Sequence, residues 1–170
     1  EQLQVFRERG SAAFARGDYR KATQWYEKAL ALQPSHADVL ANLAACALSL
    51  TPPEPRAAMA RLAPLLEAEP SHSKARLRAG RACIMLGRLR EALAHYEAAF
   101  AREKPKGPVQ LRYAAPRDER LDKPLLLAAP NGEEPSKLAQ QAVEGKALAK
   151  KLLSHTERAR ALARARRVDE

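Results

Sequence analysis

The chain of 170 residues has few aromatic side chains, and strong β-formers are scarce and scattered. Three Phe, four Tyr and one Trp are too few to fill a thick core, and no run of alternating apolar and polar residues predicts a β-sandwich or barrel. Alanine, by contrast, occurs 36 times and is the strongest helix former. We therefore expect one all-α domain with a thin core in which the helix backbones approach closely.

Cysteines and long apolar runs are also scarce. Cys46 and Cys83 lack CxxC spacing and lie in Ala-rich stretches, so they predict neither a disulfide framework nor a zinc site. The longest charge-free run, 39–53, is shorter than the roughly 20 residues of a membrane span and contains prolines, so we expect no transmembrane segment. The chain begins with Glu1, which leaves the compartment open: the cytoplasm is favoured, and an organelle reached after removal of a targeting peptide is the alternative.

Positive charge is concentrated in the second part of the chain. Residues 1–70 carry 8 basic and 8 acidic side chains, whereas residues 71–170 carry 22 and 12. Net charge governs association more than fold. The asymmetry therefore predicts an acidic partner.

An internal repeat organises the first 105 residues. Residues 17–29 recur as residues 87–99, and the sequence Pro-Ser-His of residues 34–36 recurs at 70–72. These spacings indicate three units of two helices each, at about 3–36, 37–72 and 73–105.

Small residues stand where the two helices of a unit should cross, opposite a large side chain: Gly10 with Tyr26 in the first unit, and Gly80 with Tyr96 in the third. This pattern resembles the tetratricopeptide repeat. The resemblance implies a right-handed superhelical stack of three helix-turn-helix repeats over residues 1–105. The middle unit departs from the pattern, because residues 51–55 lengthen its turn and Pro64 lies inside its second helix, where we expect a kink or an early break.

The rest of the chain divides into a Pro-rich segment and a predicted helix. Residues 105–135 hold six of the twelve prolines, so we expect an irregular linker at 106–135. Within it, residues 125–127 are three leucines that form either a staple packed onto the repeats or a hook for a partner. From Ser136, a possible N-cap, no proline interrupts a helix over 136–170 about 50 Å long. Its first turns should cap the third repeat, as such stacks require, and its basic end should project.

Motifs of catalysis are missing from the sequence. It contains no nucleophile elbow, no HExxH, no phosphate-binding glycine loop and no paired-carboxylate motif. His36 and His72 take equivalent loop positions in two units, which is typical of residues that mark the boundary between repeats. We expect no enzyme, no cofactor and no metal site.

The resemblance also implies a peptide-binding site. Some tetratricopeptide-repeat domains bind the C-terminal Glu-Glu-Val-Asp tails of heat-shock chaperones through a carboxylate clamp. The clamp positions, together with one neighbouring arginine, fall here on Arg7, Ser11, Asn42, Lys74, Arg78 and Arg81. Lys74 and Arg78 are four residues apart and share one face of a helix, where they can hold two carboxylates. The alternative is an ordinary solvated face, because residues 71–90 hold six basic and no acidic side chains.

A second basic surface is predicted on the C-terminal helix. Its members are Lys146, Lys150, Lys151, Arg158, Arg160, Arg164, Arg166 and Arg167. It suits an acidic protein, a membrane surface or nucleic-acid phosphates, or it is a solvated cap. No aromatic residue follows Tyr113, so nucleic acid would be bound by charge alone.

Two functions follow from these expectations. The first is a co-chaperone-type adaptor and scaffold for protein–protein interaction, whose groove binds an acidic C-terminal tail, such as that of a heat-shock chaperone. The second is a structural subunit of a large organellar, ciliary or ribonucleoprotein assembly, whose groove and basic helix contact other subunits.

Overall fold

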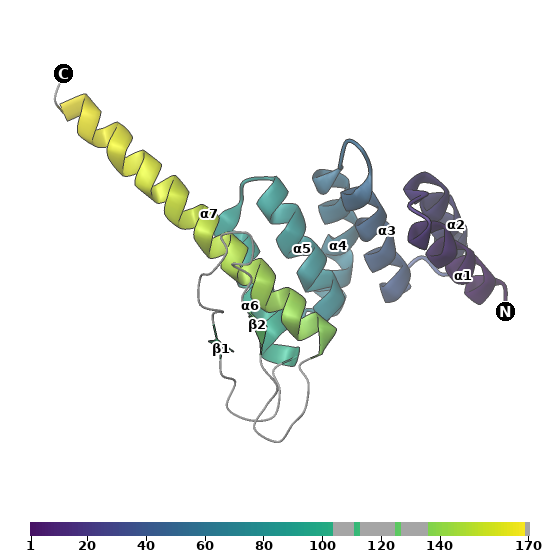
Figure 1. Cartoon of the computed structure of the whole chain (residues 1–170). Coiled ribbons are helices and arrows are strands. Elements are labelled where there is room, and N and C mark those ends of the chain that lie inside the picture. The colour runs from purple at the N-terminus through teal and green to yellow at the C-terminus, as the bar shows by residue number, and fades with distance from the viewer. Residues whose placement is uncertain (104–110, 113–124, 127–135, 169–170) are drawn as a thin grey trace.

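The computed structural model of the chain describes residues 1–103, 111–112, 125–126 and 136–168, with side chains at 1–102 and 136–164. Within these residues seven helices follow one another as a stack of hairpins closed by a longer helix (Figure 1). Their bounds are α1 Gln2–Ala15, α2 Tyr19–Leu32, α3 Ala37–Ser49, α4 Pro55–Ala68, α5 Ser73–Met85, α6 Leu89–Glu103 and α7 Lys137–Val168. The predicted all-α stack and long C-terminal helix are confirmed.

The first and third hairpins turn in the same way, on a glycine. Gly17 and Gly87 adopt φ values of +79° and +72°, which L side chains rarely adopt. Gly17 donates its N–H to the Phe14 carbonyl and Asp18 donates to Ala13, and the corresponding bonds recur after α5. This is the Schellman arrangement that ends a helix, and the Asp18 carboxylate then caps α2 by accepting from the Lys21 N–H at 3.1 Å.

The middle hairpin has no such glycine. Leu50 ends α3 in an extended conformation, and the turn continues through residues 51–54 before Pro55 opens α4. Helix α4 then runs through Pro64 to Ala68, so the expected early break does not occur. Leu62 and Leu65 on either side of Pro64 are buried, while Pro64 itself is exposed. Packing of this apolar face therefore offsets the one backbone hydrogen bond that proline removes.

The core is thin and made mostly of alanine, as expected. Alanine supplies more than half of the buried apolar side chains among the described residues, and they form separate clusters between successive hairpins. A Cβ at Gly10 would lie 2.6 Å from the ring of Tyr26, and one at Gly80 would lie 2.8 Å from the ring of Tyr96. The two glycines are therefore needed for the close approach of each helix pair.

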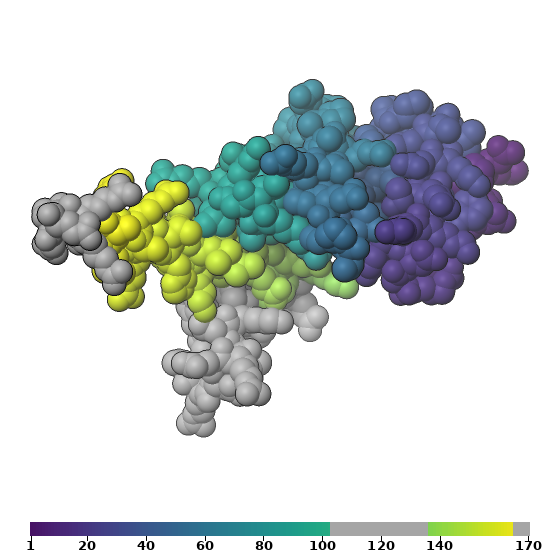
Figure 2. Space-filling model, turned by 90° about the horizontal axis from the view of Figure 1, so that it is seen from above, coloured from purple at the N-terminus to yellow at the C-terminus, as the bar shows by residue number. Residues whose placement is uncertain are grey.

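Helix α7 packs antiparallel along α6 and also contacts α5. Ala142 and Ala149 are buried there, and Ser136 caps the helix by accepting from the Ala139 N–H at 3.1 Å. Two ion pairs fix the register, Lys146–Glu97 at 3.2 Å and Glu157–Arg90 at 3.3 Å. The C-terminal end of α7 leaves the body of the stack (Figures 1 and 2), and its side chains from residue 154 to residue 164 are exposed.

A small antiparallel pair adds to the predicted elements. Strand β1 (Leu111–Arg112) pairs with β2 (Leu125–Leu126), with Leu111 opposite Leu126, and β2 lies against α7. The third leucine of the predicted staple, residue 127, lies outside the described residues. Whether the triplet is a staple or a hook stays a prediction.

Candidate functional site

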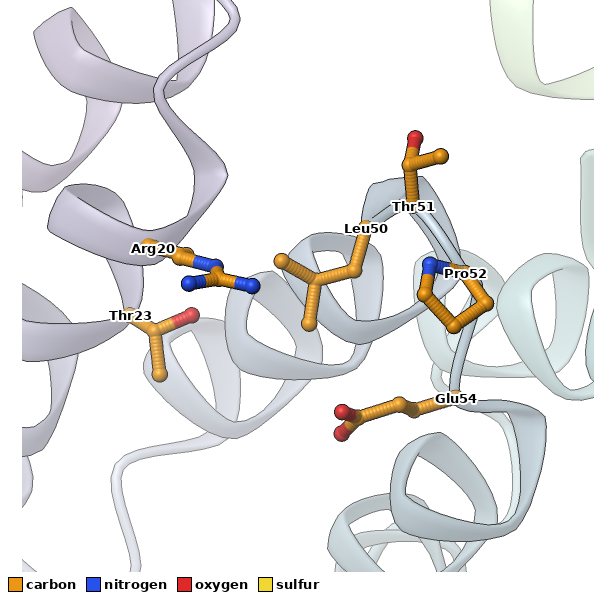
Figure 3. Close-up of a pocket in the computed structure, with 6 residues that line it drawn as sticks. All are labelled: Arg20, Thr23, Leu50, Thr51, Pro52 and Glu54. Atoms are coloured by element: carbon orange, nitrogen blue, oxygen red, sulfur yellow. The ribbon is translucent and has the colours of Figure 1, made fainter.

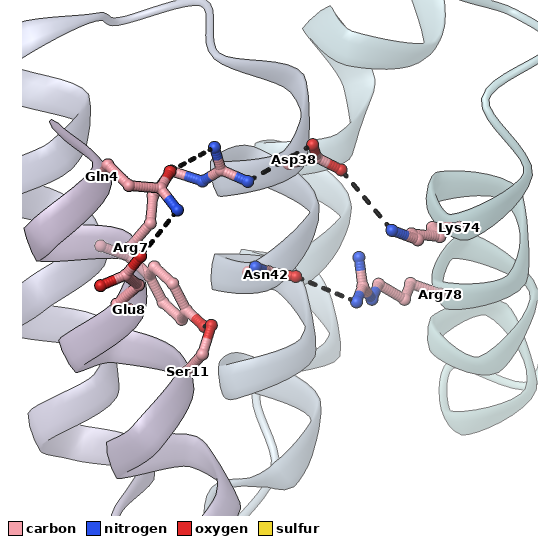
Figure 4. Close-up of polar contacts among 9 residues, drawn as sticks. Gln4, Arg7, Glu8, Ser11, Asp38, Asn42, Lys74 and Arg78 are labelled. Carbon is pink, nitrogen blue, oxygen red and sulfur yellow. Dashed lines mark hydrogen bonds and ion pairs between the residues drawn. The ribbon is translucent and has the colours of Figure 1, made fainter. Parts of the chain in front are cut away.

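The predicted clamp residues come from the first helix of each hairpin and meet on one side of the stack (Figure 4). Arg7 and Ser11 lie on α1, Asn42 on α3, and Lys74 and Arg78 on α5. Residues four apart on one helix share a face, so each helix presents its pair toward the same space. Stacking therefore brings together side chains that are up to 71 positions apart in the sequence.

Arg78 is the most deeply placed cation of this group. Its Nη2 donates to the Asn42 Oδ1 at 3.2 Å, whereas its Nη1 is buried without a hydrogen-bond partner. Burial lowers the pKa of Arg78, and the nearby Tyr26 and Asp38 oppose that shift. A guanidinium remains charged even so, and a buried, unpaired N–H of a cation is unfavourable until an acceptor reaches it. The position therefore favours a ligand with an anionic oxygen.

Arg7 and Lys74 are both engaged with a residue that the sequence analysis did not single out. The Asp38 carboxylate lies 3.7 Å from the Arg7 Nη2 and 3.7 Å from the Lys74 Nζ, between the two cations (Figure 4). Asp38 precedes Asn42 by one helical turn on α3. That spacing was the available signal that Asp38 faces the clamp.

Ser11 shares a hydrogen bond of 3.1 Å with the hydroxyl of Tyr26. The side chain of serine is shorter than that of asparagine. The contact with Tyr26 holds the Ser11 hydroxyl against helices α1 and α2. Ser11 lies at the expected place beside the clamp, with its polar group already partnered.

A groove of about 1120 Å³ continues from the clamp toward the C-terminal helix. Arg78 belongs to both, and Arg81, one turn further along α5, lines the groove. Met85 and Leu148 face it with 40% and 48% of their surface exposed. Helix α7 thus supplies a wall of the groove, which the sequence did not indicate, together with the basic side chains Lys150 and Lys151.

A smaller cavity of about 270 Å³ lies where α2 meets the turn between α3 and α4 (Figure 3). Arg20 and Thr23 line it on one side, and residues 50–52 with Glu54 line it on the other. It contains none of the predicted site residues.

The predicted basic surface of α7 divides into parts with different surroundings. Lys146 is held in the ion pair with Glu97, and Lys150 and Lys151 line the groove. Arg158, Arg160 and Arg164 are exposed on the part of α7 that leaves the stack. Residues 166 and 167 are not among the residues whose side chains the structure describes.

Cysteine and histidine take structural positions. Cys46 and Cys83 are buried and form no disulfide, and burial raises the pKa of the Cys46 thiol to about 11. His36 and His72 are the N-caps of α3 and α5, and His72 Nδ1 accepts from the Ala75 N–H at 3.2 Å. Among the described residues, no group of three or more His, Cys, Asp or Glu side chains is placed to hold a metal ion. None of the described helices has the length and apolar character needed to cross a bilayer.

Comparison with known families agrees with the repeat architecture. Residues 15–99, 85 of the 170 residues, match the family described as "Anaphase-promoting complex, cyclosome, subunit 3". The chain belongs to this tetratricopeptide-repeat family. No curated protein sequence matches the chain. Tetratricopeptide-repeat folds are in general protein-interaction modules rather than enzymes.

Solved tetratricopeptide-repeat domains are similar to the chain in structure. The Sgt2 domain from Aspergillus fumigatus is 22% identical, with a TM-score of 0.66 over 92% of this chain and 82% of that one. The first domain of Spaghetti (RPAP3), bound to the HSP90 peptide SRMEEVD, is 26% identical, with a TM-score of 0.58 over 62% and 84%. The second domain of human RPAP3, in complex with the HSP70 peptide SGPTIEEVD, is 28% identical, with a TM-score of 0.55 over 62% and 86%.

Proposed function

We propose that the protein is a non-enzymatic adaptor whose groove binds an acidic C-terminal peptide of the Glu-Glu-Val-Asp type, as found on heat-shock chaperones. The observation that carries the proposal is Arg78, a half-buried cation with one N–H unpaired, beside the Asn42 amide and within the same side of the stack as Arg7 and Lys74. A C-terminal aspartate offers two carboxylates to this set of donors.

The relatives support the same class of ligand. Two domains 26% and 28% identical to this chain were solved with HSP90 and HSP70 peptides that end in EEVD. In this chain Asn42, Lys74 and Arg78 match the clamp positions, while Arg7 and Ser11 replace lysine and asparagine. Arginine keeps the positive charge and offers a planar, bidentate donor instead of a point charge.

The groove also suggests the direction of the peptide. We place its C-terminal carboxylate at the clamp and the residues before it along Arg81 toward α7. Met85 and Leu148, both exposed in the groove, would cover an apolar side chain of the ligand. Lys150 and Lys151 are close enough to the groove to attract a glutamate.

A calorimetric titration tests the proposal. The free-acid peptide should bind with roughly micromolar Kd, about 8 kcal/mol, and the amidated peptide far more weakly. Since charge-assisted hydrogen bonds contribute about 1.5 to 3 kcal/mol, Lys74→Ala or Arg78→Ala should each weaken binding about tenfold or more. Arg61→Ala, which removes an exposed cation between α2 and α4, is the control and should leave Kd unchanged. Equal binding of free-acid and amidated peptides would rule out the clamp.

Ser11→Asn sharpens the same test. An asparagine restores the amide of the family and should tighten binding, although it gives up the hydrogen bond with Tyr26. An unchanged Kd would mean that position 11 does not contact the ligand.

A second function is supported by the projecting end of α7. Arg158, Arg160 and Arg164 are exposed on a helix segment that no other described element covers, and the matching family is named for a subunit of a large complex. The chain would then be a structural subunit of an assembly. Co-purification of the full chain and of a chain ending at His155, followed by mass spectrometry, distinguishes the two: loss of a stable set of partners on truncation favours the subunit.

A further inference from the structure

The clamp already contains a carboxylate of its own. Asp38 of α3 lies 3.7 Å from both Arg7 of α1 and Lys74 of α5, so it connects cations from the first and third hairpins (Figure 4). The three side chains are 32 to 52% exposed, so neither ion pair compensates a fully buried charge, although Asp38 also favours the charged form of the deeper Arg78. Packing of the core therefore does not account for the position of Asp38, whereas the two cations beside it do.

The two ion pairs are long and easily replaced. A direct bond between a cationic N–H and a carboxylate oxygen measures roughly 2.7 to 2.9 Å, and other pairs between elements of this chain, Arg61–Glu27 and Lys146–Glu97, measure 3.2 Å. Exposed pairs at longer distances contribute little to stability. A carboxylate of a ligand placed at direct hydrogen-bonding distance from Arg7 or Lys74 would displace Asp38 from either cation.

Asp38 also sets the charge that a ligand meets. Arg7, Lys74 and Arg78 supply three positive charges, and Asp38 reduces their sum to +2. That sum equals the two negative charges of a C-terminal acidic residue. Without Asp38 the site would attract anions more strongly and with less discrimination.

We propose that Asp38 is an internal competitor for the anion site: it pairs with Arg7 and Lys74 beside the groove, and an incoming carboxylate must take its place. This inference rests on the proposed peptide-binding function for the identity of the ligand. The competition itself applies to any anion that reaches the two cations. Asp38 is thus a specificity-determining residue that lowers the affinity of the groove for acidic ends.

The test compares Asp38→Asn with a matched control in the full chain. Asparagine keeps the size of the side chain and removes its charge. The control Glu27→Gln removes a carboxylate that also bridges two hairpins, through Arg61, but lies outside the clamp. Each protein is titrated with a free-acid peptide ending in EEVD and, separately, with pyrophosphate as a simple anion, and its thermal transition is recorded.

Asp38→Asn should bind the peptide about tenfold more tightly than the unmodified chain and should also bind pyrophosphate more tightly. Glu27→Gln should stay within about twofold of the unmodified chain for both ligands. Asp38→Glu, which keeps the charge, should show no gain. Because Asp38 also lies in the first turn of α3, where an acidic residue favours the helix, the thermal transitions check that no variant has lost its fold.

The outcomes separate the two proposals. If the unmodified chain binds the peptide and Asp38→Asn gives no gain with either ligand, Asp38 is only a helix-terminal acid and the inference is wrong while the peptide function stands. If no variant binds the peptide but Asp38→Asn binds pyrophosphate more tightly than the unmodified chain, the competition is supported and the peptide function is wrong. If peptide binding is absent and pyrophosphate affinity is unchanged, both are wrong.

Discussion

The first and third repeats share a sequence pattern, but their tyrosines contact different neighbours. Tyr26 packs on Gly10 and shares a hydrogen bond with Ser11, beside the clamp. Tyr96 packs on Gly80 in the same way, but a second glycine, Gly145 of α7, meets its ring from another helix. The end of the stack at the third repeat is therefore sealed by a helix, whereas the open end, at the first repeat, pairs its tyrosine hydroxyl with a serine.

Residues at equivalent positions of the first and third repeats differ in the same way. Arg7 and Ser11 of the first repeat correspond, 70 residues later, to Leu77 and Arg81. Leu77 is buried in the cluster of the third repeat, while Arg7 is partly exposed and pairs with Asp38. A repeat fixes the geometry of its helix pair, and the few side chains outside the pattern decide whether that pair presents polar groups or packs against another helix.

Removing the seal should have the largest effect on stability. A chain ending at Pro135 loses α7 and exposes Tyr96, Ala99 and Phe100, so its free energy of unfolding should fall by about 3 to 5 kcal/mol. A chain ending at His155 loses the exposed Glu157–Arg90 pair and little buried surface, so it should unfold almost like the full chain. Urea denaturation measures both. Identical transitions for all three chains would mean that α7 is not a cap.

The next largest effect should come from alkaline pH, which should lower the stability of the end of the stack that α7 seals. Burial raises the pKa of Tyr96 to about 12 and also raises the pKa of Tyr26. The folded state therefore favours both neutral phenols, and for Tyr96 this contribution is complete below pH 10 and is lost as pH rises toward 12. For Tyr96 the loss amounts to about 2 to 3 kcal/mol.

Tyr96→Phe isolates that contribution. Its unfolding free energy, measured by urea denaturation from pH 8 to 11.5, should fall less steeply with pH than that of the full chain. Tyr26→Phe is the counterpart at the open end; it should lose about 0.5 to 1.5 kcal/mol already at neutral pH, because it removes the bond to Ser11. Parallel pH curves for the chain and for Tyr96→Phe would contradict the prediction.

The smallest predicted effect is that of Gly145→Ala, and the sign of its change in unfolding free energy is informative. Replacing a glycine inside a helix by alanine normally stabilises it by up to about 1 kcal/mol. Gly145→Ala should instead destabilise the chain by about 1 to 2 kcal/mol, because the new Cβ would overlap the ring of Tyr96. Ala161→Gly, on the projecting part of α7, should change the global unfolding free energy by less than about 0.5 kcal/mol. A stabilising Gly145→Ala would mean that α7 is not tightly packed there.

Local features of the sequence predicted the repeats, two close helix crossings and the cap of the last helix, because short-range chemistry decides them. Glycine opposite tyrosine marks the crossings of the first and third hairpins, and Ser136 caps α7. The positive φ of Gly17 and Gly87 is a finding of the structure. Pro64 was predicted less well. Its effect depends on how firmly the buried Leu62 and Leu65 hold the helix, and that is a property of tertiary packing.

Composition and spacing along the chain were enough to predict an all-α stack of three hairpins and a basic final helix, and the family resemblance supplied the predicted clamp positions. Only the tertiary structure decided that Asp38 lies between Arg7 and Lys74, which are 67 positions apart, because the rotation of one hairpin on the next sets that contact. It also decided the register in which α7 packs on α6. A helix of 32 residues offers several apolar registers, and Gly145 against Tyr96, with the two ion pairs, selects one of them.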